Sequence, residues 1–485
     1  MRRVLWCVWL LLPATAWAEI PPGALELQQT IHQVIEKAEP SVACVLVSRS
    51  GKYAELNEVP SPAIPGKLGG FNPIRHMRLA DGVQLALVKR LDLADPEAVP
   101  DSFGSGVVLD ATGLILTNYH VIEKATKIYV RLPGDSKGSY ADIIGADSRA
   151  DLAVLRVITP LTLKPITFGD GTRVRKGDWI VSLANLLGTG FRDGSPSASW
   201  GIISNIRRRG PGPTDEVKRT KPLTQYATLL QTDARLNFGC SGGAILNLNG
   251  ELIGLSTSLA ALTGGETAGG YAIPMSPNTR KIIDVLKQGQ EVEYGFLGVS
   301  VQPDDKPVGG GILVRDVSPG TPAARAGIRG GDYITAIDGA PMREHDDLFL
   351  HIATALAGNE SKITLRGGRT VSVRLVKASH SEPFIAANRP RPVHGITVDY
   401  LSTIPGDGAI ESGVLIREIV PGSDADRKMG KKAANTRLVV VSVDGIAVNT
   451  PAEFYRAAQG KSRLTLDVAD TDRDSATPRE KVTLP

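Results

Sequence analysis

Residues 229–244 read Leu-Leu-Gln-Thr-Asp-Ala-Arg-Leu-Asn-Phe-Gly-Cys-Ser-Gly-Gly-Ala, and the rest of the chain can be interpreted outward from this stretch. At its centre, Ser241 lies between Gly239 and two further glycines. Glycine lets the backbone turn tightly because no Cβ blocks the path. Such a turn can direct successive N–H groups at one point, as an oxyanion formed by serine attack requires. The stretch predicts a nucleophile with its oxyanion hole at Gly239, Cys240 and Ser241, although Gly-x-Ser-Gly-Gly also occurs in ordinary turns.

A serine nucleophile needs a base, and the base needs an orienting carboxylate. His120 follows the apolar run 114–117, and Asp151 stands at the start of the apolar run 152–155. The order His120, Asp151, Ser241 is that of chymotrypsin-type proteases. Taken singly, the histidine could be a strand-end residue and the aspartate a turn residue. Together, the three predict a catalytic triad.

These motifs resemble the HtrA (Deg) family of exported PDZ serine proteases. The resemblance rests on Thr-Asn-Tyr-His-Val at 117–121, Asp-Leu-Ala-Val-Leu at 151–155, and Gln-Thr-Asp-Ala followed by Asn-x-Gly-x-Ser-Gly-Gly-Ala within 231–244. It extends from about residue 25 to about residue 470. It implies a periplasmic endopeptidase that degrades unfolded or misfolded exported proteins in a stress response, assembled as a homotrimer or larger homo-oligomer.

The first residues have the form of a secretory signal peptide. A basic start, a short apolar core at 4–12 and Ala-x-Ala at 16–18 predict cleavage after Ala18. The apolar core is too short for a stable membrane span, which leaves an uncleaved anchor as the alternative. We therefore expect an exported protein with no membrane span after cleavage.

Composition fits a multidomain globular protein, because 42% of its 485 residues are hydrophobic. Removal of the leader leaves 53 of the 55 basic residues against 51 acidic residues, so no strong field exists to capture nucleic acid. The basic run 207–209 carries no interleaved aromatic residues and is explained as a solvated loop. No Cys/His cluster has metal-ligand spacing, and no cofactor is expected. Cys44 and Cys240 remain after cleavage, and an oxidising compartment would allow one disulfide between them.

The first half of the chain predicts a mainly β domain. Helical periodicity at 25–38 is followed by an apolar run at 42–47 and then by a Pro- and Gly-rich interruption at 49–100. Short apolar runs then alternate with turns as far as residue 273, which is typical of a β-barrel or sandwich. Residues 277–288 read as a closing helix. With the resemblance, residues 19–290 are expected to form a trypsin-like double β-barrel with a long insertion.

The second half repeats itself. Residues 311–320 match residues 413–422, and Ile-Asp-Gly at 337–339 matches Val-Asp-Gly at 443–445. The two units, about 293–378 and 391–485, look like PDZ domains joined by the linker 379–390. Such a domain adds a peptide C-terminus as a strand and holds its carboxylate in a backbone nest. The expected loop of the first unit is Phe296, Leu297, Gly298 and Val299, beside a groove helix at 344–356; peptide binding by the second, divergent unit is left open.

Two further features shape the expected function. Cys240 stands where the family usually has Asn, so a neutral thiol cannot pair with a new N-terminus, and we expect no proteolytic zymogen activation. No acid lies at 235–238 or 255–258, which predicts cleavage after small or medium aliphatic residues. Cys240 and the altered 184–188 loop also leave open an alternative function, a weakly active chaperone or PDZ scaffold of the same family. Substrates, activating signal, resting activity and oligomer size are not specified by the sequence.

Overall fold

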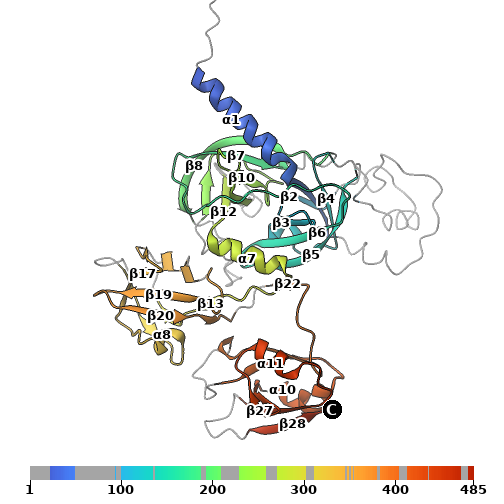
Figure 1. Ribbon diagram of the computed structural model, residues 1–485, viewed down its shortest axis with the longest axis vertical. Helices are drawn as coiled ribbons and strands as arrows, with labels where there is room; N and C mark the ends of the chain where they lie inside the picture. The colour runs from blue at the N-terminus through green and yellow to red at the C-terminus, as the bar shows by residue number, and fades with distance from the viewer. Residues whose placement is uncertain are drawn as a thin grey trace, which may run out of the picture.

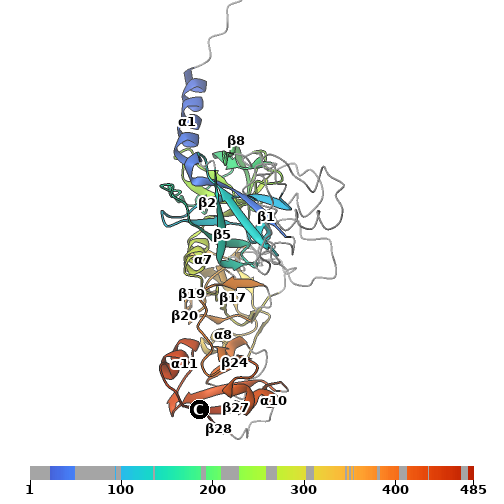
Figure 2. The same cartoon turned by 90° about the vertical axis from the view of Figure 1, so that its right-hand side faces the viewer.

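The computed structural model describes residues 22–49, 93, 100–134, 137–186, 193–208, 229–257, 270–301, 311–343, 347–348, 351–352, 354–379, 383–403, 412–434, 436–470 and 479–485. The predicted leader and nearly all of the predicted insertion lie outside these residues. Along the long axis the chain places α1, two β-barrels and two smaller β domains in succession (Figures 1 and 2). No helix within the described ranges is long and apolar enough to cross a bilayer.

The first barrel holds six strands and is closed by the pairing of β5 with β6. β1 and β3 are buried along their whole length, which suits their apolar residues, whereas β5 mixes buried and half-exposed positions. The strands are β1 (Val42–Ser48), β2 (Ser102–Val108), β3 (Leu114–Thr117), β4 (Lys127–Arg131), β5 (Ser139–Asp147) and β6 (Leu152–Val157).

The second barrel is also closed and also has six strands, in the order β10-β11-β12-β9-β8-β7. Its members are β7 (Trp179–Ala184), β8 (Ser197–Arg208), β9 (Leu229–Thr232), β10 (Ala244–Leu246), β11 (Leu252–Thr257) and β12 (Gly270–Pro274). The two barrels share one large apolar cluster. This architecture confirms the predicted mainly β, chymotrypsin-like fold.

Two helices flank the barrels. Helix α1 (Pro22–Ala38) packs Val34 and Ala38 into the shared core, whereas Leu25 near its start is 42% exposed. Helix α7 (Pro277–Lys287) begins where the Ser276 hydroxyl accepts the N–H of Thr279, and it buries Ile282, Ile283 and Leu286 in the shared core. Helix α1 was predicted from the periodicity at 25–38, and α7 was predicted as a closing helix at 277–288.

Each C-terminal domain is a small sheet with short helices. The first contains β13 (Gly295–Phe296), β14 (Val299–Ser300), β15 (Ile312–Leu313), β16 (Asp316–Val317), α8 (Pro322–Arg325), β17 (Tyr333–Ile337), β18 (Ala340–Pro341), β19 (Glu360–Leu365), β20 (Thr370–Arg374) and β21 (Val376–Lys377). The second contains β23 (Ile396–Tyr400), β24 (Val414–Ile419), the short π-helix η6 (Asp426–Gly430), α10 (Lys431–Ala433), β25 (Leu438–Val443), β26 (Ile446–Ala447), α11 (Pro451–Ala458), β27 (Leu464–Asp470) and β28 (Glu480–Leu484). Each domain has its own apolar core.

The segment expected to be a plain linker contains a strand. β22 (Phe384–Ala386) pairs antiparallel with β5 and so adds a seventh strand to the sheet of the first barrel. In Figure 1 it lies at the lower edge of the barrels, between them and the second C-terminal domain. The linker is therefore part of the protease fold as well as a connection.

Candidate active site

The structure brings His120, Asp151 and Ser241 together. His120 Nε2 lies 2.9 Å from Ser241 Oγ, and His120 Nδ1 lies 2.8 Å from Asp151 Oδ2. The backbone N–H of His120 also donates to Asp151 Oδ1, at 3.0 Å. These contacts fix the imidazole so that Nδ1 faces the carboxylate and Nε2 faces the hydroxyl.

Each of the three side chains comes from a different connection. His120 lies in the short helix α4 (Tyr119–Ile122), which follows β3, and Asp151 lies in the turn from β5 to β6. Ser241 precedes β10 in the second barrel. Asn118 Nδ2 donates to the backbone oxygen of Asp151 at 2.9 Å, which ties the histidine segment to the aspartate turn. The site therefore spans the junction of the two barrels.

Asp151 adopts φ of 53°, a left-handed conformation that Asp tolerates better than most residues. Burial lowers the pKa of His120, whereas the charge and hydrogen bond of Asp151 raise it, and the net result is a pKa above its ordinary value. Arg49 lowers this pKa slightly and Glu123 raises it slightly. The site is thus arranged to stabilise an imidazolium.

The turn before Ser241 carries the residues expected to form the oxyanion hole. The Cys240 N–H donates to Asn237 O at 3.0 Å, and Gly239 has φ of 90°, which together form a turn that requires glycine at its third position. Within the described residues, no hydrogen bond occupies the Gly239 N–H. Because the Cys240 N–H is used inside the turn, Cys240 shapes the hole rather than serving as a donor, and Gly239 with Ser241 remains the expected donor pair.

Sequence reasoning missed Ser105, which anchors this turn. Ser105 is fully buried, and its N–H donates to Ser241 O at 2.7 Å. Its hydroxyl donates to Gly239 O at 2.7 Å and accepts the Asn185 N–H at 2.8 Å. A Cβ on Gly242 would lie 2.0 Å from Ser105 O, so the two segments approach as closely as glycine permits. The buried polar contacts of a serine in an apolar strand leave no distinctive sequence signal.

Cys240 turns away from the triad. Its side chain is 2% exposed and belongs to the core of the second barrel with Ile180, Leu230 and Ile245. Burial raises the pKa of its thiol. Burial also raises the pKa of Cys44, to about 12, and both cysteines are free thiols. The disulfide considered from the sequence is therefore absent, and the geometry favours Ser241 over Cys240 as nucleophile.

The residues expected to border the primary pocket are partly described. Leu236 is buried against Gly270, where an added Cβ would lie 2.2 Å from its side chain, and Phe238 is 48% exposed. Leu255 and Thr257 are buried, whereas residue 258 lies outside the described residues. The described part of this border contains no acidic side chain.

The expected PDZ loops of the two C-terminal domains have matching geometry. Gly298 and Gly395 have φ of 89° in each case. An added Cβ on them would lie 2.2 Å and 2.1 Å from the side chains of Thr321 and Ser423, respectively. In the first domain Leu297 is buried, Val299 is half-buried and Phe296 is 39% exposed. Of the groove helix predicted at 344–356, residues 347–348 and 351–352 are helical. Residues 354–356 are not helical, so the predicted end of the helix was wrong, and the other six residues lie outside the described residues.

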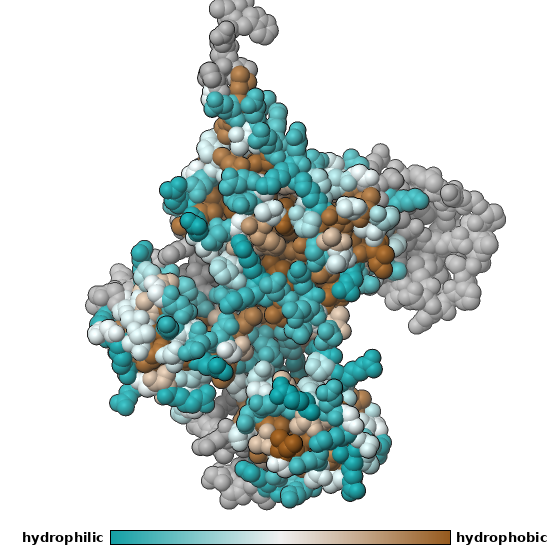
Figure 3. Space-filling model, in the orientation of Figure 1, coloured by the Kyte–Doolittle hydropathy of each residue, from teal (hydrophilic) through white to brown (hydrophobic). Residues whose placement is uncertain are grey.

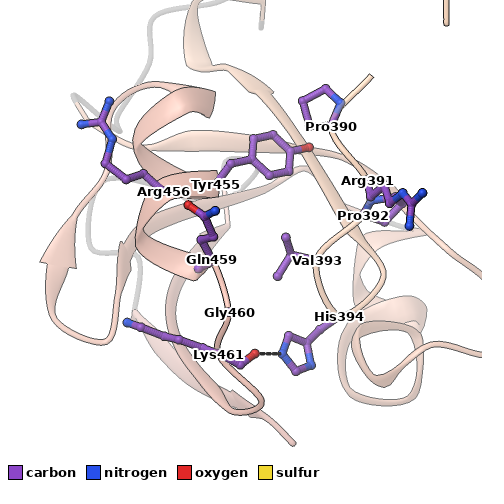
Figure 4. A pocket seen from close by; sticks show the side chains of 11 residues that line it. Pro390, Arg391, Pro392, Val393, His394, Tyr455, Arg456, Gln459, Gly460 and Lys461 are labelled. Atoms are coloured by element: carbon purple, nitrogen blue, oxygen red, sulfur yellow. Dashed lines mark hydrogen bonds between the residues drawn. The ribbon is translucent and has the colours of Figure 1, made fainter. Parts of the chain in front are cut away.

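The second domain has a cavity of about 780 Å³ between its loop and α11. Figure 4 shows Val393, His394 and Tyr455 around it, with the side chains of Arg456 and Lys461 extending away. His394 Nε2 contacts the backbone oxygen of Lys461 at 3.2 Å. In the first domain the corresponding position is the buried Leu297.

Comparisons with known proteins agree with this description. The pattern of the trypsin-like peptidase domain matches residues 104–255, and that of the PDZ domain matches residues 295–376. The periplasmic pH-dependent serine endoprotease DegQ of Escherichia coli is 33% identical over 388 residues, covering 77% of this chain and 79% of that protein. The periplasmic serine endoprotease DegP of the same organism is 31% identical, covering 76% and 75%. A solved structure of the HtrA-type protease AlgW with a tripeptide is 25% identical, covers 73% of this chain and 98% of its own, and gives a TM-score of 0.48.

Proposed function

The chain belongs to the HtrA family of PDZ-containing serine proteases, and we propose that it hydrolyses unfolded polypeptides in the periplasm through Ser241, His120 and Asp151. It is a serine endopeptidase, as its curated relatives are. The observation that carries the residue assignment is the continuous contact from Asp151 through His120 to Ser241, with both distances below 3.0 Å.

The mechanism follows from this geometry. Ser241 Oγ attacks the peptide carbonyl while His120 Nε2 accepts its proton. Asp151 holds the imidazole and stabilises the cation that forms. The Gly239 and Ser241 N–H groups stabilise the oxyanion. His120 then returns the proton to the leaving amine, and water releases the acyl group from Ser241 in a second, equivalent step.

We assign residues 19–290 to the protease domain, 293–378 to the first PDZ domain and 391–485 to the second, after a leader at 1–18. The first PDZ domain would capture substrate C-termini on its loop 296–299. The buried Leu236 and the lack of acids at residues 235–238 and 255–258 support cleavage after small or medium aliphatic residues. A cleavage map dominated by Lys or Arg would contradict that specificity.

We further propose a homo-oligomer built on the surface beside α1. Trp179 and Trp200 are 39% and 53% exposed and stack with ring centroids 4.8 Å apart. Helix α1 packs on β7, the strand that Trp179 begins. Figure 3 shows apolar residues along α1 and over the adjoining barrel surface. Exposed aromatic side chains of this kind are typical of protein interfaces. A Trp200→Ser variant that sediments as a smaller particle than the unsubstituted protein would support this proposal.

Active-site labelling tests the function. The mature protein is treated with a fluorophosphonate, with and without an unfolded substrate, and the adduct is located by mass spectrometry beside a Ser241→Ala control. Label on Ser241 is expected, and dependence on substrate would show that the site is switched. No label on folded protein under either condition would favour the alternative, a chaperone or PDZ scaffold.

A further inference from the structure

The turn that carries Asp151 is held by a residue from outside the barrels. Tyr294 is fully buried at the start of the first PDZ domain, and its hydroxyl donates to Asp147 Oδ1 at 2.7 Å. The same oxygen accepts the N–H of Ala150 at 2.6 Å. The Arg149 guanidinium lies over the Tyr294 ring, 4.2 Å from its centroid. Tyr294 therefore contacts residues 147 and 149 directly, and it is linked to residue 150 through the Asp147 carboxylate.

The linker between the PDZ domains holds the other side of the turn. Phe384 of β22 pairs with Asp147, and the N–H of Ser148 donates to the Pro383 oxygen at 3.2 Å. The N–H of Ala387 donates to the Ile144 oxygen at 3.0 Å. These bonds extend the sheet edge up to the first residue after β5. The turn thus begins at a position that the linker determines.

The span between these contacts and the triad is short. Asp147 and Asp151 are separated by the three residues 148–150, and the Asp151 N–H donates to Ser148 O at 3.3 Å. Asp151 itself is 7% exposed and left-handed, so its carboxylate has little freedom to recover its place if the turn shifts. Displacements of about 1 Å at a catalytic group can cost up to roughly a hundredfold in rate.

We propose that Asp147 and Tyr294 are positioning residues for Asp151 and that strand β22 supports the same turn. The geometry of the triad is then determined by the attached PDZ segments as well as by the barrels. This inference rests on the proposed role of Asp151 in the triad. The described bonds of these three groups go to the turn that carries Asp151 and to β5, so they would act on the reaction through Asp151. Their effect is on the orientation of the carboxylate that holds His120.

Tyr294→Phe in the full mature chain is the central test, since it removes one hydroxyl and keeps the ring under Arg149. We expect kcat on a short peptide to fall about tenfold with an unchanged KM, because the substrate pocket is untouched. The acid limb of the pH–rate profile should move to lower pH, because His120 loses part of its contact with Asp151. Loss of packing alone would lower stability without moving that limb.

Two variant pairs provide controls. Asp147→Asn keeps an oxygen acceptor and should stay within about threefold of the wild type. Asp147→Ala removes the acceptor of the Ala150 N–H as well as that of the Tyr294 hydroxyl, and should lower kcat at least as much as Tyr294→Phe. Ile385 is 38% exposed on β22, so Ile385→Pro removes a strand N–H while Ile385→Ala keeps it. Only the proline variant should lower kcat. Tyr400→Phe removes a hydroxyl bonded to Glu293, away from the turn, and should leave the pH profile in place.

The outcomes separate the two levels of the argument. The positioning role is overturned if the folded Tyr294→Phe and Ile385→Pro variants keep the kcat and the acid limb of the unsubstituted protein. If Ser241 of the unsubstituted protein also labels normally, the proposed function remains intact. Failure of wild-type Ser241 to label would overturn the proposed function, and the positioning role with it. If Tyr294→Phe does not fold, the Asp147 and Ile385 pairs decide the question.

Discussion

Ser105 offers the sharpest test of the catalytic geometry outside the triad. The Ser105→Ala substitution removes the hydroxyl that links Gly239 O to the Asn185 N–H, both of which are buried. A buried polar group left without a partner costs about 1–3 kcal/mol, so the two groups together cost about 2–6 kcal/mol. A domain of ordinary stability, about 5–15 kcal/mol, can carry much of that cost and remain folded. The loop around Gly239 should therefore relax while the barrels persist.

The assay is the second-order rate of fluorophosphonate labelling at Ser241, measured beside urea unfolding. A free-energy change of about 1.4 kcal/mol corresponds to a factor of ten in rate. If only about a quarter of the 6 kcal/mol cost destabilises the active conformation of the loop around Gly239, labelling should slow at least tenfold. Ser139→Ala is the matched control, since its exposed hydroxyl bonds only the Ile158 oxygen, at 2.9 Å. The control should label at the wild-type rate. A folded Ser105→Ala protein that labels within twofold of the wild type would refute the reasoning.

Three further predictions concern charge and backbone. The raised pKa of His120 places the acid limb of the kcat/KM profile above pH 6.5, because the imidazole accepts a proton only when it is neutral. Asp151→Asn should move this limb to lower pH. A wild-type limb below pH 6.5 would contradict the prediction. Gly242→Ala, strained by φ of 86° and by Ser105 O, should abolish labelling in protein whose circular dichroism shows it folded. The Lys377 side chain is 3% exposed and lies 2.7 Å from both Glu291 and Asp399, so Lys377→Met should lower the free energy of unfolding by about 3–5 kcal/mol. Faster proteolysis of the linker is expected in this variant. An unchanged proteolysis rate would show that the junction does not depend on Lys377.

The buried ion cluster at that junction also has a defined pH dependence. Burial raises the pKa of Glu291, but Lys377 and Arg417 lower it, and the net pKa lies below its ordinary value. A lowered pKa means that this carboxylate stabilises the junction above its unfolded pKa of about 4.3, and that this stabilisation is lost as pH falls through the folded pKa. The junction should hold at neutral pH and loosen in strong acid, which small-angle scattering would detect.

The sequence was sufficient to predict a strand where the local run of apolar residues matched the burial of those residues in the fold. β3 coincides with its apolar run at 114–117, and β6 begins with its apolar run at 152–155, because the residues of both runs are buried. β5 shows no clear apolar run because buried and half-exposed residues mix along it. β22 was not expected in the linker, because Phe-Ile-Ala becomes a strand there only when β5 offers an edge. Pairing between distant segments decides such strands, and no local signal records it.

The site shows the same division. The triad could be predicted because its residues stand in long motifs, whereas Ser105, Asp147 and Tyr294 act through buried hydrogen bonds to backbone or to one another. A serine in a strand, an aspartate at a strand end and a tyrosine near a domain boundary are all ordinary residues in a sequence. Only their three-dimensional contacts distinguish them.

The stacked indoles also give the mature protein a built-in optical probe. Of the five tryptophans in the chain, three lie within residues 1–18, and Trp179 and Trp200 are the two that remain once that segment is removed. Their rings are 11° from parallel and partly exposed. With the predicted leader removed, the whole tryptophan emission would originate from one patch beside α1, and its wavelength and exciton signal would report the burial of that patch without any label being introduced.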